Sequence, residues 1–83
     1  GTLPGKPAPD VYLRACARLG VAPKDAIIFE DAFAGIASAH AAGAGAIVAI
    51  TATNPASALA NLPGVKAVID DYRDLDAVLS RLC

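Results

Sequence analysis

Two hydrophobic periodicities alternate along the chain. Apolar residues three or four positions apart, the spacing of one helix face, occupy segments bounded by Asp, Asn, Pro or Gly. Between them lie short continuous apolar runs, which are typical of strands buried on both faces of a sheet. Asn54 and Asp74 are expected to cap the third and fourth helices. The predicted helices span 12–19, 33–41, 55–62 and 75–82, and the predicted strands span 26–29, 46–50 and 65–69.

The regular alternation of helix and strand decides the fold class. Strands joined through helices by short loops imply right-handed crossovers and a parallel sheet with helices on both faces. We therefore expect an α/β fold, a piece of a doubly wound sheet with about three strands and four helices. Because sheets usually have about five or six strands, at least one strand edge should be open.

Composition indicates a folded chain and excludes several classes of partner. Hydrophobic residues make up 55% of the 83 residues and charged residues only 18%, against about 25% in an ordinary soluble domain. A chain this apolar is not disordered, and at this length it requires an efficient core or a partner. A net charge of −1 argues against binding of nucleic acid or an acidic membrane. The apolar run 41–52 is shorter than the roughly 20 residues that cross a bilayer, so no membrane segment is expected.

The cysteines and the N-terminal segment bear on the compartment. Cys16 and Cys83 lie far apart and form neither a disulfide framework nor a zinc motif, which favours a reducing cytosol. Residues 1–6 have no signal-peptide core, and the chain contains no Met. We expect a cytoplasmic protein, and we interpret the chain as a fragment with a cut start.

Two acids stand where the predicted sheet should bind a ligand. In open α/β sheets, ligands bind beyond the carboxyl ends of the strands, and Glu30-Asp31 directly follow the first apolar run. Adjacent carboxylates repel each other unless a cation or a proton reduces the repulsion, and paired hard oxygen ligands suit Mg²⁺. Acids at a helix start also complement the helix dipole. The spacing alone leaves both interpretations open.

Lys6 is the second candidate. The following Pro7-Ala8-Pro9 restricts the backbone to an extended course, which would aim the ammonium group in one direction. A lysine is a good point-charge partner for phosphate oxygens or for crowded carboxylates. Taken alone, a lysine near a chain start is more often a solvated surface charge. Its combination with the acidic pair is what singles it out.

Three stretches of the chain together resemble a known family. They are GKPAPDVY at 5–12, IFEDAFAGI at 28–36 and the segment 39–43. In register from Lys6 to about Asp71, the chain is similar to the C-terminal half of proteins of the haloacid dehalogenase (HAD) superfamily, in its β-phosphoglucomutase and phosphatase-like branch. The combination of K-P-x-P-D with E-D-x-x-x-G-I is much more specific than either motif alone.

The resemblance implies a three-layer Rossmann-like core and an enzyme acting on a small phosphorylated metabolite such as a sugar phosphate. It implies that Lys6 is catalytic and substrate-binding, because the family lysine steadies the phosphate and the nucleophilic carboxylate. It also implies that Glu30 and Asp31 hold Mg²⁺, with Asp31 as the direct ligand. The family mechanism forms an aspartyl-phosphate and then transfers the phosphoryl group to water or to a second hydroxyl.

The chain also departs from the family pattern. The family nucleophile is an aspartate in a D-x-D-G-T motif, and nothing in this chain reads D-x-D-G. The phosphate-binding Ser or Thr and the helical cap that selects the substrate would likewise precede Gly1, and Ala32 stands where the family usually has Ser. The resemblance thus implies that residues 1–83 are the C-terminal portion of one core domain. The remainder of that domain would supply the nucleophile, and this chain alone would be inactive.

One alternative belongs to a different functional class: a non-catalytic binding or regulatory domain that keeps this half-fold. The sequence determines neither the phosphorylated substrate nor the choice between hydrolysis and mutase transfer. Other chemistry-bearing residues are expected to be structural or solvated, with His40 on the outer side of its helix, Cys16 in the core, and Asp70 and Asp71 in a loop. The G-x-G at 43–45 precedes a strand, so it is not a dinucleotide-binding loop.

Overall fold

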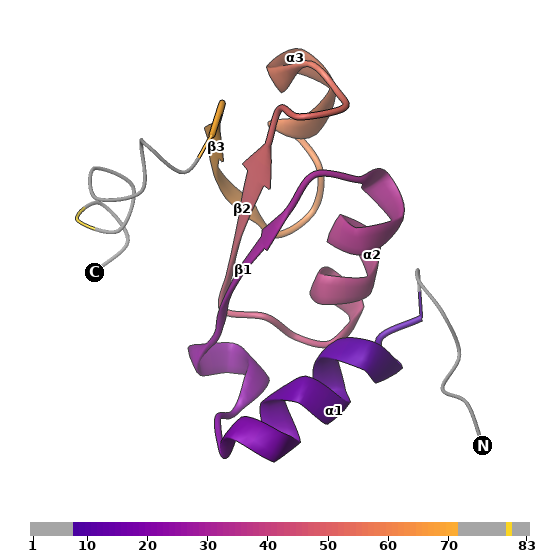
Figure 1. Cartoon of the computed structure of the whole chain (residues 1–83), viewed down its shortest axis with the longest axis vertical. Coiled ribbons are helices and arrows are strands. Elements are labelled where there is room, and N and C mark those ends of the chain that lie inside the picture. Colours follow the sequence, from indigo (N-terminus) through magenta and orange to yellow (C-terminus); the bar gives the residue numbers. More distant parts are fainter. Residues whose placement is uncertain (1–7, 72–79, 81–83) are drawn as a thin grey trace.

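The computed structural model describes residues 8–71 and Ser80. Three strands form a parallel sheet in the order β1-β2-β3 (Figure 1). The predicted α/β fold class is confirmed in this part of the chain. The helix predicted at 75–82 lies outside the described residues, apart from Ser80, which is helical. The elements are α1 (Asp10–Leu19), a 3-10 turn (Pro23–Asp25), β1 (Ile27–Glu30), α2 (Phe33–Ala41), β2 (Ala46–Ile50), α3 (Ala56–Leu59) and β3 (Val65–Ile69).

Most predicted boundaries agree with the structure because local signals set them. The first helix ends at Gly20, which adopts the left-handed conformation (φ 71°) and donates its N–H to the carbonyl of Ala17. The predicted ranges 33–41, 46–50 and 65–69 match α2, β2 and β3. β1 begins one residue later than predicted, because the N–H of Ala26 still donates to the carbonyl of Pro23 and closes the 3-10 turn.

The third helix is shorter than predicted. It spans Ala56–Leu59 instead of 55–62, since the chain then leaves through turns in which Leu62 N donates to the carbonyl of Leu59 and Val65 N to that of Leu62. The predicted cap is also wrong. The residue at the N-cap is Pro55, no side chain caps the helix, and Asn54 makes other contacts.

The strands differ in burial. All five residues of β2 are buried, whereas all four residues of β1 are half-buried. The prediction that the first strand is buried on both faces is therefore wrong for the described part of the chain. Among the described residues β1 pairs only with β2, so its other edge has no partner strand. An open edge is what the small number of strands predicted.

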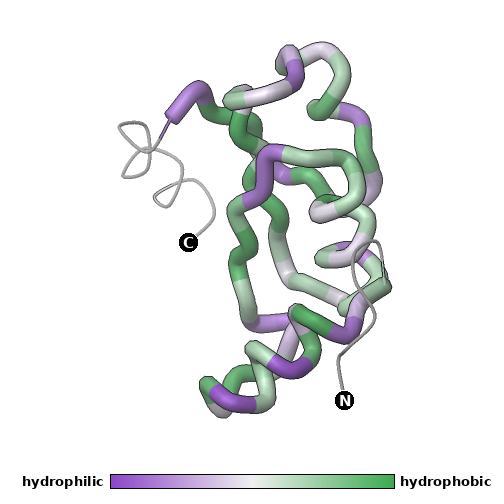
Figure 2. The backbone as a smooth tube through the Cα atoms, turned by 45° about the vertical axis from the view of Figure 1, so that its right-hand side comes forward, coloured by the Kyte–Doolittle hydropathy of each residue, from purple (hydrophilic) through white to green (hydrophobic). Residues whose placement is uncertain are grey.

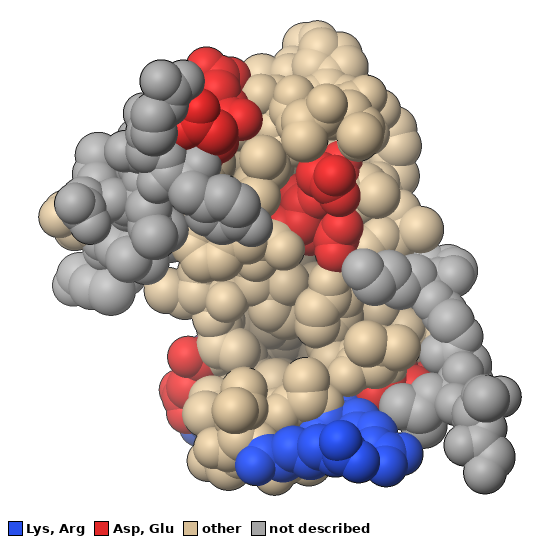
Figure 3. All heavy atoms as spheres, in the orientation of Figure 1, with Lys and Arg blue, Asp and Glu red and all other residues tan. Residues whose placement is uncertain are grey.

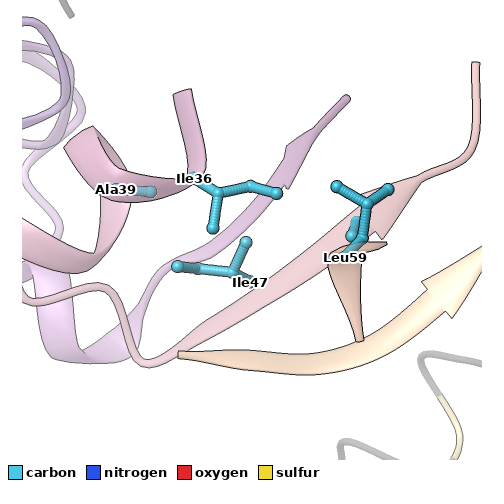
Figure 4. Close-up of a cluster of buried hydrophobic side chains, with 5 residues drawn as sticks. Ile36, Ala39, Ile47 and Leu59 are labelled. Atoms are coloured by element: carbon cyan, nitrogen blue, oxygen red, sulfur yellow. The ribbon is translucent and has the colours of Figure 1, made fainter. Parts of the chain in front are cut away.

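Two apolar clusters form the core, one on each face of the sheet. The larger packs Ile36 and Ala39 of α2 and Leu59 of α3 onto Ile47 and Ala49 of β2 (Figure 4). The other consists of strand residues, with β2 and β3 contributing its buried members and β1 packing beside them. Within residues 8–71, helix side chains join only the larger cluster, so helical cover of the second face stays a prediction. Figure 2 shows the apolar strands giving way to polar residues at the junction of β1 and α2.

Candidate functional site

Polar side chains gather at the carboxyl ends of the three strands. Glu30 closes β1 and Asp31 follows it, Thr51 to Asn54 follow β2, and Asp70 follows β3. In Figure 3, acidic groups lie in the upper half of the molecule, and basic side chains lie along its lower end beside further acidic groups. Ligands of open α/β sheets bind at this edge, and the acidic pair lies there, as the sequence predicted.

The carboxylate of Glu30 is held from two sides. Its Oε1 accepts hydrogen bonds from the backbone N–H of Asp31 (3.1 Å) and of Ala32 (3.3 Å), and its Oε2 accepts one from the Tyr12 hydroxyl (2.5 Å). Glu30 therefore ties α1 to the junction of β1 and α2. From the sequence, Tyr12 only begins the helix predicted at 12–19, and no role for its hydroxyl was predicted. The sequence signal that could have indicated this contact is the Tyr12 hydroxyl, because a packed tyrosine usually needs a hydrogen-bond partner.

Gly35 makes room for this arrangement. A Cβ built on Gly35 would overlap the Cγ, Cδ and Oε2 atoms of Glu30. The glycine in the first turn of α2 thus lets the Glu30 carboxylate lie against the helix backbone. Ala32 stands at the N-cap of α2 without a side-chain cap hydrogen bond, which is the contact that a serine there could supply.

Asp31 is half-buried and lines a hollow of about 250 Å³. The other lining residues are Phe29, Glu30, Ile50 and Ala52, so the hollow opens beside the ends of β1 and β2. The main-chain carbonyl of Asp31 accepts hydrogen bonds from Thr53 Oγ1 (3.1 Å) and from Asn54 Nδ2 (3.2 Å). Sequence reasoning missed both residues, because Asn54 before Pro55 is an ordinary helix-start signal.

The two carboxylates fit a magnesium ion by their chemistry. Among residues 8–71 and Ser80, no group of three or more His, Cys, Asp or Glu side chains comes together. Mg²⁺ commonly uses one or two carboxylates and keeps several waters, so Glu30 and Asp31 are side chains that could hold such an ion. Hydrogen-bond donors engage both oxygens of Glu30, and both acids line the hollow.

Lys6 lies outside the described residues. The nearest described anchor is Ala8, whose carbonyl accepts a hydrogen bond from the fully buried Ser38 hydroxyl of α2 (2.6 Å). That contact fixes the chain two residues after Lys6 against the helix that starts at the acidic pair. Together with the hydrogen bond from Tyr12 to Glu30, it ties the 8–12 segment to the region of the acidic pair.

His40, Cys16 and Asp70 lie where the sequence suggested, whereas Asp71, expected to be solvated, is half-buried. His40 is exposed on α2, and Cys16 is buried. Asp70 is exposed and accepts a hydrogen bond from the Thr51 hydroxyl (2.9 Å). Gly45 precedes β2 and donates its N–H to the carbonyls of Pro23 and Ala26, so the 43–45 segment is part of the fold and not a phosphate loop. Within the described residues, no helix is long and apolar enough to span a membrane.

Comparison with known proteins identifies a family model and relatives that this chain matches. Residues 1–43 match the family model of haloacid dehalogenase-like hydrolases. The β-phosphoglucomutase of Mycobacterium tuberculosis is 42% identical over 73 residues, covering 86% of this chain and 28% of the relative. The validoxylamine A 7'-phosphate phosphatase of Streptomyces hygroscopicus subsp. limoneus is 52% identical over 56 residues, covering 68% of this chain and 26% of the relative. The chain therefore spans less than a third of the length of these relatives.

A solved structure agrees with the sequence matches. The HAD hydrolase of family IA, variant 3, from Entamoeba histolytica superposes with a TM-score of 0.82 at 38% identity, over 88% of this chain and 32% of that one. The family model covers the Lys6 and Glu30-Asp31 motifs. The chain belongs to the haloacid dehalogenase-like hydrolase family.

Proposed function

We propose that this chain is the C-terminal portion of the core domain of a Mg²⁺-dependent phosphatase or phosphoglucomutase-type enzyme. Its substrate would be a small phosphorylated metabolite such as a sugar phosphate. The observation that carries the proposal is the acidic pair at the carboxyl end of β1, with Asp31 lining the hollow. Relatives named as a β-phosphoglucomutase and as phosphatases of phosphorylated carbohydrates support the substrate class.

Each candidate residue has a role in this proposal. Asp31, and with it Glu30, would hold Mg²⁺, which when bound supplies Lewis-acid neutralisation of phosphate charge. Lys6 would pair with phosphate oxygens and with the nucleophilic carboxylate. An aspartate outside this chain would attack the phosphoryl group and form an aspartyl-phosphate, which water or a substrate hydroxyl then receives. The enzyme would work in the cytoplasm, and this chain alone would be inactive.

Removal of the metal tests the proposal. The complete protein that contains this chain should release phosphate from, or interconvert, members of a panel of sugar phosphates in the presence of Mg²⁺. Chelation with EDTA should abolish the reaction, and added Mg²⁺ should restore it. Monitoring free phosphate and isomerised sugar phosphate together separates a phosphatase from a mutase. Activity that survives complete chelation would contradict the metal assignment.

The non-catalytic alternative makes the opposite prediction. If the domain only binds or regulates, no member of the panel is turned over, with or without Mg²⁺. Intact-mass measurement of the natural protein distinguishes the two cases first. An accompanying segment with a D-x-D-G-T motif favours the enzyme, and a natural product of these 83 residues alone favours the binding domain.

The isolated chain should fold poorly. Among the described residues, the half-buried strand β1 has a partner strand on one side only, and an edge strand invites pairing with other chains. We expect the purified 83-residue chain to aggregate or to melt without cooperativity, as measured by size-exclusion chromatography and circular dichroism. Addition of the remainder of the domain should yield a monodisperse species. A cooperatively melting monomer of the isolated chain would contradict this prediction.

A further inference from the structure

The main chain of Asp31 lies between two regular elements. The pairing of β1 with β2 ends at Glu30, opposite Ala49, and the first hydrogen bond of α2 runs from Ile36 N to the carbonyl of Ala32. Backbone groups in such a gap need partners from elsewhere. The N–H of Asp31 donates to the side chain of Glu30, and its carbonyl accepts from Thr53 and Asn54. Side chains therefore bind both the N–H and the carbonyl of Asp31.

The loop that supplies Thr53 and Asn54 is itself anchored. At its start, Thr51 N donates to the carbonyl of Ile69 (2.9 Å), and the Thr51 hydroxyl donates to Asp70 (2.9 Å). Asn54 Nδ2 also donates to Thr53 Oγ1 (3.3 Å), so the two side chains form one unit at the Asp31 carbonyl. The loop thus connects the candidate metal ligand to the buried strand β2 and to the end of β3.

Asn54 departs from its ordinary local role in this arrangement. An Asn before the first turn of a helix usually caps that helix with its side-chain oxygen. Here no side chain caps α3, and the Asn54 amide nitrogen lies on the Asp31 carbonyl. Departures from a local rule tend to mark functional positions.

We propose that Thr53 and Asn54 are positioning residues for Asp31. They hold the main-chain carbonyl of Asp31, and through it they would orient the carboxylate of a residue that lines the hollow toward a divalent cation. The inference rests on the proposed function, and it adds that the loop after β2 tunes the metal affinity of a ligand after β1. Groups that orient a metal ligand typically change affinity by about 10- to 100-fold when removed.

The test compares Mg²⁺ binding in four variants of the complete protein by isothermal titration calorimetry. Thr53→Val and Asn54→Ala each remove one donor to the Asp31 carbonyl. Ser57→Ala is the control for the first, because it removes an exposed hydroxyl of α3. Asn61→Ala, at an exposed asparagine, is the control for the second. We expect Kd for Mg²⁺ to rise about tenfold in the first pair and to stay unchanged in the controls.

Two further measurements separate positioning from a merely structural role. Both test variants should need more Mg²⁺ than the unsubstituted protein for half-maximal activity. At saturating Mg²⁺, their kcat should equal that of the unsubstituted protein. Thr53→Ser keeps the hydroxyl and should retain the wild-type Kd. A wild-type Kd in folded Thr53→Val and Asn54→Ala would overturn the inference and leave the proposed function intact. Absence of Mg²⁺ binding by the unsubstituted protein would overturn both.

Discussion

Replacing Asp31 by asparagine should lower Mg²⁺-dependent turnover of the complete protein by about three orders of magnitude. A metal supplies several kcal/mol of charge stabilisation to phosphoryl transfer, and about 1.4 kcal/mol corresponds to tenfold in rate. The amide keeps the shape of the side chain and leaves the backbone contacts to Glu30, Thr53 and Asn54 in place. The negative charge of a side chain that lines the hollow is what disappears. Steady-state kinetics over a Mg²⁺ titration measures the effect.

Asp70→Asn is the matched control for that substitution. Asp70 also follows a strand at the same end of the sheet, but it is exposed, and an amide oxygen can still accept the hydrogen bond from Thr51. Its turnover should stay near that of the unsubstituted protein. Unchanged turnover of Asp31→Asn at saturating Mg²⁺ would refute the role of Asp31. Melting curves of both variants establish that the fold is retained.

Replacing Gly35 by alanine should destabilise the protein by about 2 kcal/mol, within the range of overpacked sites and lost hydrogen bonds. Helix propensity alone predicts the opposite sign, since alanine in a helix is about 1 kcal/mol better than glycine. The added Cβ would overlap the carboxylate end of Glu30, which Tyr12 and the backbone hold in place. Glu30 must therefore move and lose those contacts. Urea denaturation of the complete protein measures the change.

A double-mutant cycle isolates the cause. In a Glu30→Ala background the obstructing side chain is absent, so Gly35→Ala should become neutral or stabilising. Ala34→Gly, at the exposed neighbouring position of α2, should cost only the propensity difference of about 1 kcal/mol. Equal destabilisation by Gly35→Ala in both backgrounds would show that contact with Glu30 is not the reason for the glycine.

The order and type of the described elements could be predicted from the sequence because local chemistry sets them. Gly20 ends a helix by its left-handed backbone, and the continuous apolar run 46–50 has no stable place except inside a sheet. Burial of the first strand could not be predicted in the same way. Residues 26–29 are as apolar as a central strand, but β1 lies at an edge of the described sheet, and strand order is a long-range property.

In the candidate site, too, the local features could be predicted from the sequence and the long-range contacts could not. The acids Glu30 and Asp31 stand out because they follow an apolar strand in an α/β pattern, and the resemblance through Lys6 added a phosphate chemistry. Glu30 and Asp31 are neighbours in the sequence, but their different hydrogen-bond partners cannot be read from it. Only the fold brings the Tyr12 hydroxyl to Glu30, 18 positions away in sequence, and Asn54 to Asp31, 23 positions away.

By itself, the sequence determined the α/β class, the placement of an acidic pair at a strand end, and the family. Such features depend on periodicity and on short motifs, which act over a few residues. Tertiary structure alone decided that the Tyr12 hydroxyl reaches Glu30 and that the loop after β2 holds Asp31. The physical reason is that hydrogen-bond partners in a parallel sheet come from segments separated by a whole helix crossover. No local pattern of residues encodes which of them meet.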